Sequence, residues 1–396
     1  MKKRLIALAL CLLLVTLVFV SCGESDYDAA KEYIEKNQLT PEKPYLTLNM
    51  YIPTNLATHE AIDPAVVAAM QAEFNAIIEP KYRTRIQFCL IDETEYESVV
   101  AQQYAVSATQ ADSGVKEEKT YLLNDKFPQL SASQCDIFVM TGKEMFDSYV
   151  AQNALCDLTS SLTTSYSRIL NDEIGRDKAI CSLIYDHANV DGVYYGVPAN
   201  FKIGFYSYYA IEREFYNKYY APSGEGVTTK QVLDVLRSAD SEGFSSHVLE
   251  YTGDYRARFT IPYDGVNTDD YIILVDDSEA KKPTVTYDEL FNGMFCISRT
   301  CESSSRALEV IAELYTNKEL HSILQYGVKN VTYTTTTDAS GNVVSVTPIA
   351  EGPAYSISPA YTGNILTLYP STDPSLGIDP ENAYYIWLQN SEAAYK

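Results

Sequence analysis

Histidine and tryptophan are scarce in this chain of 396 residues, which holds four His and one Trp. The sequence contains no HExxH motif, and the four His residues are scattered: His59, His187, His247 and His321. Zinc sites need ligands at short, regular spacings, so the sequence predicts no metal site.

Positive charge is also in short supply, with 30 Lys and Arg against 53 Asp and Glu and a formal net charge of −23. Such a surface repels phosphate backbones and anionic headgroups, which argues against nucleic acid as a partner and against charge-driven membrane binding. We expect a neutral or cationic partner. The apolar fraction of 46% is ordinary for a folded protein, and the length predicts two medium domains.

Signatures of catalysis are missing as well. No G-x-S-x-G, P-loop or dinucleotide fingerprint occurs. Ser113 and Lys116 have an S-x-x-K spacing but lie in a polar stretch without its partner motifs. Neighbouring carboxylates such as Asp269 and Asp270 point to opposite faces of a strand and cannot act as a glycosidase pair. The sequence therefore predicts neither an enzyme nor a cofactor.

The N-terminus predicts export. Lys2, Lys3 and Arg4 precede an apolar run of about sixteen residues, shorter than the roughly twenty that span a bilayer. The following VFVSC resembles the lipobox of bacterial lipoproteins, with Phe19 where Leu is usual. This resemblance implies a signal peptide at 1–21, a lipidated Cys22, and attachment to the outer face of the cell membrane. Residues 22–44 are polar and acidic and read as a tether.

Six cysteines remain after Cys11 and Cys22. An even number in an exported protein permits disulfides. The candidate pairs are Cys296 with Cys301 and Cys156 with Cys181. Buried free thiols are an equally good reading of Cys89 and Cys135, which lie in predicted strands. The sequence leaves the pairing open among all six: Cys89, Cys135, Cys156, Cys181, Cys296 and Cys301.

Hydrophobic periodicity predicts an α/β fold. Residues 45–53 alternate between apolar and polar, and the apolar helical stripe that begins at Val66 follows the N-cap pair Asp63-Pro64. A strand at 84–91, a polar helix near 93–107 and a buried strand at 135–140 follow. This βαβαβ order predicts a doubly wound lobe. Further along, Thr228, Ser303–Ser305 and Asn317 read as starts of helices, and Asp338–Asn342 as the turn of a hairpin.

Four stretches carry a resemblance to a known family: DIFVMTG at 136–142, DGVYYGVPANF at 191–201, ALEVIAELYTNKELHSILQYGVKNVTY at 307–333 and YTGN at 361–364. In this order they resemble extracellular solute-binding protein family 1, the substrate-binding lipoproteins of bacterial ABC transporters. The resemblance implies a two-lobed, periplasmic-binding-protein-like (type II) fold with the ligand in a cleft between the lobes. It also implies a monomer that works with a membrane permease.

The resemblance divides the body into a first lobe, 45–199 plus 286–328, and a second lobe, 200–285 plus 329–396. The second lobe has few residues, so we expect it to be reduced. The end of the chain, 379–396, reads as a helix with Tyr384, Trp387 and Leu388 on one side. We expect that helix to leave apolar surface open, through truncation or for a partner.

Ligands of doubly wound sheets sit beyond the carboxyl ends of the strands. The loops after 45–52 and 135–140 should therefore contribute ligand contacts, and the first crossing between lobes should contribute two more. Trp387 joins the set because its segment resembles a stretch near the family's cleft. The predicted contacts are Tyr51, Thr54, Asn55, Thr141, Gly142, Asn200, Phe201 and Trp387.

Tyrosine is the strongest compositional signal, with 33 residues against 13 Phe. Aromatic rings pack on the apolar faces of sugars while hydroxyls bond sugar oxygens, although most tyrosines of any strand-rich protein are core residues. We expect a lipoprotein that captures a neutral solute, a sugar or oligosaccharide, and delivers it to an ABC permease. The alternative is a surface glycan-binding or adhesion lipoprotein without a transport role.

Overall fold

The computed structural model describes residues 45–113, 134–162, 187–201, 205–220, 227–253, 268–276, 284–373 and 394–395. The predictions for the signal peptide, Cys22, the tether and the Trp387 helix lie outside these residues. No helix in the described ranges is long and apolar enough to span a membrane.

The first lobe is built in the predicted order. Five elements form the βαβαβ unit: β1 (Leu46–Thr54), α3 (Pro64–Tyr82), β2 (Thr84–Asp92), α4 (Glu93–Ser113) and β3 (Ile137–Thr141). The Asp63 side chain caps α3 by accepting a hydrogen bond from the Ala65 N–H at 2.8 Å. The predicted apolar stripe is buried at Val66, Met70, Phe74 and Ile78. Local sequence signals therefore set the first three strands and two helices.

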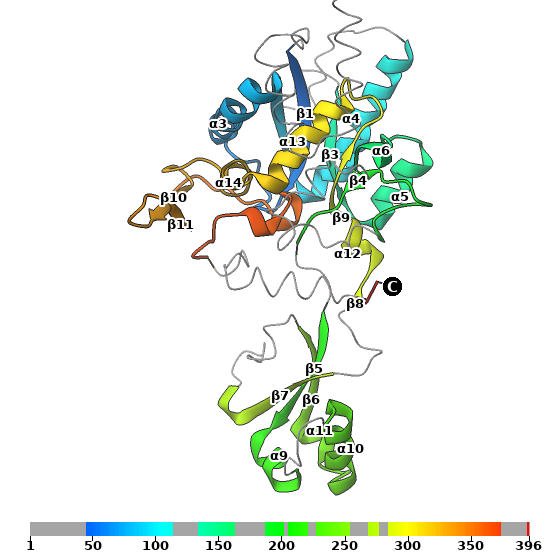
Figure 1. Cartoon of the computed structure of the whole chain (residues 1–396), viewed down its shortest axis with the longest axis vertical. Coiled ribbons are helices and arrows are strands. Elements are labelled where there is room, and N and C mark those ends of the chain that lie inside the picture. The colour runs from blue at the N-terminus through cyan, green and yellow to red at the C-terminus, as the bar shows by residue number, and fades with distance from the viewer. Residues whose placement is uncertain are drawn as a thin grey trace, which may run out of the picture. The chain divides into compact units, whose positions relative to one another are not determined.

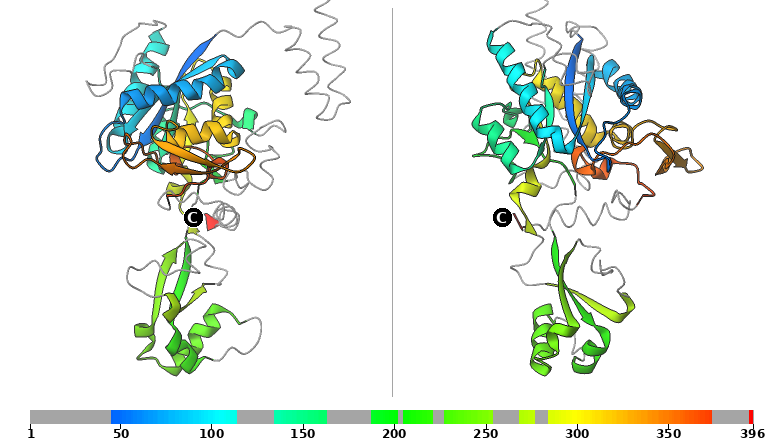
Figure 2. Two further views of the ribbon diagram at one scale, coloured as in Figure 1. Left: turned by 90° about the vertical axis from the view of Figure 1, so that its left-hand side faces the viewer. Right: turned by 180° about the vertical axis from the view of Figure 1, so that it is seen from behind.

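The sheet of this lobe has the strand order β2-β1-β3-β9-β4, completed by β9 (Asn292–Ile297) and β4 (Gly196–Val197). β1 and β3 are parallel, and β9 is antiparallel to β3 and β4. Figures 1 and 2 show α13 (Ser304–Thr316) and α14 (Lys318–Tyr326) on one face and α4 on the opposite face. α5 (Lys143–Ala151) contacts β3, and the short α6 (Thr159–Leu162) follows it.

Residues 329–373 correct the predicted division into lobes. The sequence assigned 329–396 to the second lobe, but the described part packs on the first. The Gln325 amide of α14 donates to the Ile357 carbonyl at 2.8 Å, and the Ser356 hydroxyl donates to Asn55 Oδ1 at 2.8 Å. Ile357, Ile365 and Leu368 are buried there. A hairpin pattern in the sequence predicts its own two strands. It does not predict which hydrophobic core the neighbouring residues will pack against.

This segment contains the predicted hairpin, formed by β10 (Tyr333–Thr337) and β11 (Val343–Pro348) as an antiparallel pair. Two 3-10 turns follow, η4 (Pro359–Tyr361) and η5 (Ile365–Thr367). Before β9, β8 (Thr284–Val285) pairs in parallel with β12 (Ala394–Tyr395), and α12 (Tyr287–Phe291) leads into β9.

The described part of the second lobe has a three-stranded antiparallel sheet, β6-β5-β7. Its strands are β5 (Tyr206–Glu212), β6 (Val248–Gly253) and β7 (Tyr271–Val275), and the 3-10 turn η3 (Thr268–Asp270) precedes β7. Its helices are α9 (Arg213–Tyr219), α10 (Thr229–Ala239) and α11 (Phe244–His247). Thr228 starts α10 with a capping box, as predicted.

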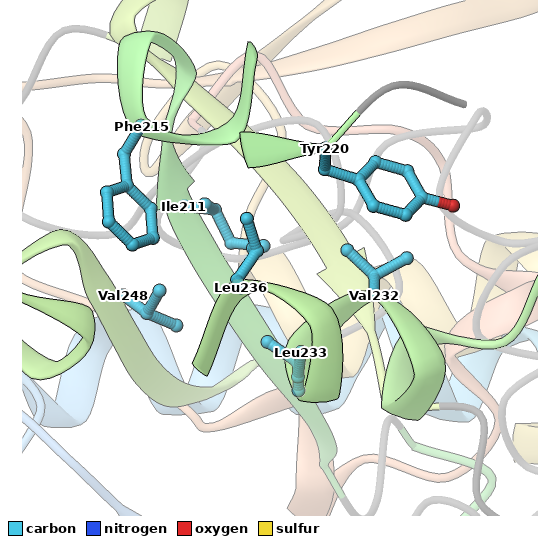
Figure 3. Packing of buried hydrophobic residues seen from close by; sticks show 7 residues of the cluster. All are labelled: Ile211, Phe215, Tyr220, Val232, Leu233, Leu236 and Val248. Atoms are coloured by element: carbon cyan, nitrogen blue, oxygen red, sulfur yellow. The ribbon is translucent and has the colours of Figure 1, made fainter. Parts of the chain in front are cut away.

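Figure 3 shows the core that fixes these helices to their sheet. Ile211 of β5 and Val248 of β6 meet Phe215 of α9 and Leu236 of α10. On the other face of the sheet, Tyr206, Tyr208 and Tyr251 form a second buried cluster. Most tyrosines of this sheet are therefore core residues. This agrees with the interpretation that a high tyrosine content reflects packing in a strand-rich protein.

Candidate functional site

The carboxyl ends of β1 and β3 lie together at one edge of the first-lobe sheet. The parallel register pairs Tyr51 with Phe138, so the strands end together at Thr54 and Thr141. Thr54 is 1% exposed, and its hydroxyl has no hydrogen-bond partner in the part of the chain that the structure describes. Buried hydroxyls nearly always find partners, so this one is an unmet polar group at the edge where the fold places ligands.

Thr141 and Gly142 begin the loop that leads into α5. The Thr141 hydroxyl donates a hydrogen bond to Glu97 of α4. The Lys143 N–H donates to Asp288 Oδ1 of α12 at 3.0 Å, so that carboxylate caps the start of α5. A Cβ at position 142 would stand 2.5 Å from the same oxygen. Glycine at 142 therefore lets Asp288 approach.

Gly142→Ala tests this contact. The added methyl group must push the Asp288 carboxylate off the Lys143 amide, and losing a cap costs about 1 kcal/mol. We expect a stability loss of that size in urea unfolding. Asp288→Ala should cost about as much, and the double variant should cost no more than either single change. Additive losses would contradict a shared contact.

Tyr361, from η4, brings the other polar groups of this edge together. Asn292, at the start of β9, lies near the Tyr361 hydroxyl. Burial raises the pKa of Tyr361, and the carboxylates of Glu93, Glu97 and Asp288 raise it further, while Asn292 lowers it. All three carboxylate residues are exposed, while Tyr361 is half-buried. Glu93 and Glu97 are one turn apart on α4 and share a face. We call this group, Glu93, Glu97, Asp288, Asn292 and Tyr361, the acidic edge.

The acidic edge is rich in hydrogen-bond acceptors. Carboxylates accept hydrogen bonds from pairs of hydroxyls or from ammonium groups, and an anion brought among them is repelled. The nearby Lys143 ammonium contributes little positive charge, because it forms an ion pair with Asp147 one turn along α5. The Asn292 side-chain oxygen is buried without a hydrogen-bond partner among the described residues. This chemistry suits a hydroxyl-rich molecule that is neutral or cationic and disfavours an anion.

Of the predicted contacts, Tyr51 is wrong. Its ring is 0% exposed, and its hydroxyl donates to the Gln134 carbonyl at 3.1 Å, beside the amino end of β3. Burial raises the pKa of this phenol. The strand runs three residues further than Tyr51, to Thr54, so the tyrosine points into the core far from the carboxyl edge.

Asn200 and Asn55 have structural roles in this structure. Asn200 is 1% exposed, and its amide donates to Asn364 Oδ1 at 2.9 Å. Its backbone bonds Gly363 and Ile365 on the same segment. Asn55 accepts from the Ser356 hydroxyl, and Phe201 packs against the cluster around Tyr326. Thr54, Thr141 and Gly142 do lie at the predicted edge.

Sequence reasoning missed the acidic edge itself. Glu93 and Glu97 stand one turn apart directly after the predicted strand 84–91, and Tyr361 opens the YTGN stretch. These residues can be seen in the sequence. No pattern of neighbouring residues predicts that Tyr361, Asn292 and Asp288 lie near α4.

A separate crevice lies between α14, the hairpin and the segment 355–357. Its volume is about 40 Å³, and it is lined in part by Tyr326, Tyr333 and Tyr355. Ligand pockets usually measure about 300–1,000 Å³, so this crevice has room for a few waters only. The described residues contain no group of His, Cys, Asp and Glu arranged to hold a metal ion.

Comparison with known proteins finds similar folds among solved structures but no similar sequence. No protein-family model matches the sequence, and no curated protein matches it. The chain is similar in structure to the N-glycan transport solute binding protein (NgtS) from Streptococcus pneumoniae. That likeness has a TM-score of 0.52 at 14% identity and covers 89% of this chain and 84% of that chain.

The same Streptococcus pneumoniae protein in complex with Man1GlcNAc gives a TM-score of 0.50 at 14% identity, over 88% of this chain and 84% of that chain. At such low identity the likeness shows the fold alone. The predicted type II, periplasmic-binding-protein-like α/β fold is therefore confirmed. These neighbours are binding proteins rather than enzymes.

Proposed function

We propose that this protein is an extracytoplasmic solute-binding protein that captures a neutral saccharide and delivers it to an ABC-transporter permease. The acidic edge carries the proposal, because it sets acceptors and a tyrosine at the strand ends where this fold binds ligands. The structural neighbour that binds Man1GlcNAc supports a saccharide as ligand. The net charge of −23 supports a neutral one.

A thermal-shift screen of neutral oligosaccharides tests the proposal. A ligand that binds only the folded state, present at 100 times its Kd, adds about 2.7 kcal/mol to the unfolding free energy. We expect at least one neutral saccharide to raise the melting temperature. The proposal would be wrong if no neutral saccharide raised the melting temperature while acidic peptides or phosphate esters raised it clearly.

Glu97→Gln and Tyr361→Phe test whether the acidic edge contacts the ligand. Each change keeps the shape of the side chain and removes a charge or a hydroxyl. A hydrogen bond to a charged group contributes about 1.5–3 kcal/mol, so we expect Kd to rise roughly tenfold to a hundredfold for Glu97→Gln. Glu351→Gln, at an exposed carboxylate after β11, is the matched control. If Glu97→Gln, Tyr361→Phe and Glu351→Gln all bind the ligand with wild-type affinity, the ligand binds elsewhere.

Membrane attachment through Cys22 belongs to the same proposal. A thioether-linked diacyl group supplies two chains, enough for stable anchoring. Cys22→Ala should therefore move the exported protein from the membrane fraction to the soluble fraction. A variant that still sediments with membranes after export would remove the lipid anchor from the account.

A further inference from the structure

Two half-buried cysteines lie close together at the amino end of β3, the edge of the first-lobe sheet opposite the acidic edge. Residues 154–156 run antiparallel to the end of β9: the Cys156 N–H donates to Ile297 O at 2.9 Å, and the Arg299 N–H donates to Ala154 O at 2.8 Å. Cys301 follows in the turn that leads from β9 to α13. Sequence spacing suggested other pairs for both cysteines.

One carbonyl oxygen brings the two cysteines together. The Cys156 thiol donates to Ser298 O at 3.2 Å, and the Cys301 N–H donates to the same oxygen at 3.0 Å. The Cys156 sulfur is therefore within about 6 Å of the Cys301 nitrogen. The turn is held in place, because Ser298 Oγ bonds both the Thr300 hydroxyl at 2.8 Å and the Thr300 N–H at 3.1 Å.

The environment separates this pair from the other described cysteines. Cys89, Cys135 and Cys296 are 3%, 0% and 0% exposed, so a reagent in solution does not reach them in the folded protein. Cys156 and Cys301 are half-buried. Burial raises the pKa of both thiols, and the charge of Cys156 raises that of Cys301, as expected for close neighbours. The buried carboxyl of Asp136 lies near the Cys301 thiol and also raises the pKa of that thiol.

We propose that Cys156 and Cys301 are a disulfide-forming pair that ties the α5–α6 connection to the start of α13. With oxidised glutathione as oxidant, the Cys156 thiolate attacks one glutathione sulfur and releases one reduced glutathione. The Cys301 sulfur then attacks the Cys156 sulfur and expels the second reduced glutathione. The proton of the Cys301 thiol passes to Asp136 or to water. The protein loses two hydrogens, and one oxidised glutathione becomes two reduced molecules.

Asp136 is placed to assist the second step. Its Oδ2 accepts from the Asn49 N–H at 2.9 Å, which fixes the carboxyl next to the Cys301 thiol. Burial raises the pKa of Asp136 to about 6, so the carboxylate is ionised and able to accept a proton at pH 8. Asp136→Asn should therefore slow the formation of the disulfide without removing it.

The test is a peptide map of the folded full chain. The protein is incubated at pH 8 with oxidised glutathione, its remaining thiols are blocked with N-ethylmaleimide under denaturing conditions, and it is digested without reductant. We expect one cross-linked peptide pair, Cys156 with Cys301, that disappears on reduction. Oxidised protein should also unfold at higher urea than reduced protein, because the link closes a long loop.

Three variants sharpen the result. Cys156→Ser and Cys301→Ser should each abolish both the cross-link and the urea shift, whereas Cys181→Ser should keep both. Both sulfurs recovered as blocked thiols in the oxidised wild type would overturn the proposal. So would a link from Cys156 to Cys181, or from Cys301 to Cys135 or Cys296. The map of the wild type decides the question even if a variant fails to fold.

Discussion

Lys81→Met should lower the unfolding free energy by about 3 kcal/mol, because it removes an ion-pair partner from a buried carboxylate. Glu313 of α13 has a side chain only 1% exposed, and its Oε1 accepts from Lys81 Nζ of α3 at 2.5 Å. Tyr82 and Asn317 also donate to this carboxylate, at 2.6 and 3.0 Å. Those two bonds survive the change, which keeps the expected loss at the lower end for a broken buried pair.

A second ion pair on the same stretch of chain is the matched control for Lys81→Met. Arg85 bonds Glu79 through two nitrogens, at 2.7 and 2.9 Å, but the Arg85 side chain is 60% exposed and that of Glu79 is 25% exposed. Exposed pairs contribute little to stability, so Arg85→Met should leave the urea midpoint nearly unchanged. Equal losses from the two variants would show that burial of Glu313 does not decide the cost.

His321 should make the protein lose stability in acid. The ring is 0% exposed and lies between two hydroxyls, with Nδ1 2.8 Å from Thr367 Oγ1 and Nε2 3.0 Å from Thr362 Oγ1. Burial lowers the pKa of His321 to about 3. Between that pH and about 6.5, the unfolded chain holds a proton on this residue that the folded chain does not. Stability from the neutral ring is therefore complete above about pH 6.5 and is lost as the pH falls, by about 5 kcal/mol in all.

Urea unfolding of wild type and His321→Gln across pH 7 to 4 measures this contribution. The glutamine keeps a polar atom near Thr362 but does not titrate. We expect the variant to be less stable at pH 7 and the difference to shrink as the pH falls. The comparison is made between the two proteins because Asp136 titrates in the same range with the opposite sign: burial raises its pKa to about 6. A difference that stays constant with pH would show that the ring is not kept neutral.

The fold was predictable where local patterns decide it. Alternation marked β1, the Asp63-Pro64 pair marked the start of α3, and Asn317 marked the start of α14, where its side chain accepts from the Leu320 N–H at 3.1 Å. These signals depend on residues within a few positions of one another. Long-range placement does not, which is why residues 329–373 were assigned to the wrong lobe.

The candidate site was half predictable for the same reason. Strand ends placed Thr54, Thr141 and Gly142 at one edge of the sheet, because the carboxyl ends of parallel strands share an edge. Tyr51 failed because the strand extends three residues beyond it. Tyr361 and Asn292 reach the edge through packing of segments far apart in the chain, and no spacing in the sequence reports such an encounter. The Cys156 and Cys301 neighbourhood was missed on the same grounds.

Titration calorimetry of the purified chain tests the central claim most directly. Neutral oligosaccharides are compared with an acidic peptide and a phosphate ester under the same conditions. The account predicts binding of a neutral saccharide with a Kd on the order of micromolar, about −8 kcal/mol, and no binding of either anion. Tight binding of the acidic peptide or the phosphate ester, with no heat from any saccharide, would contradict it.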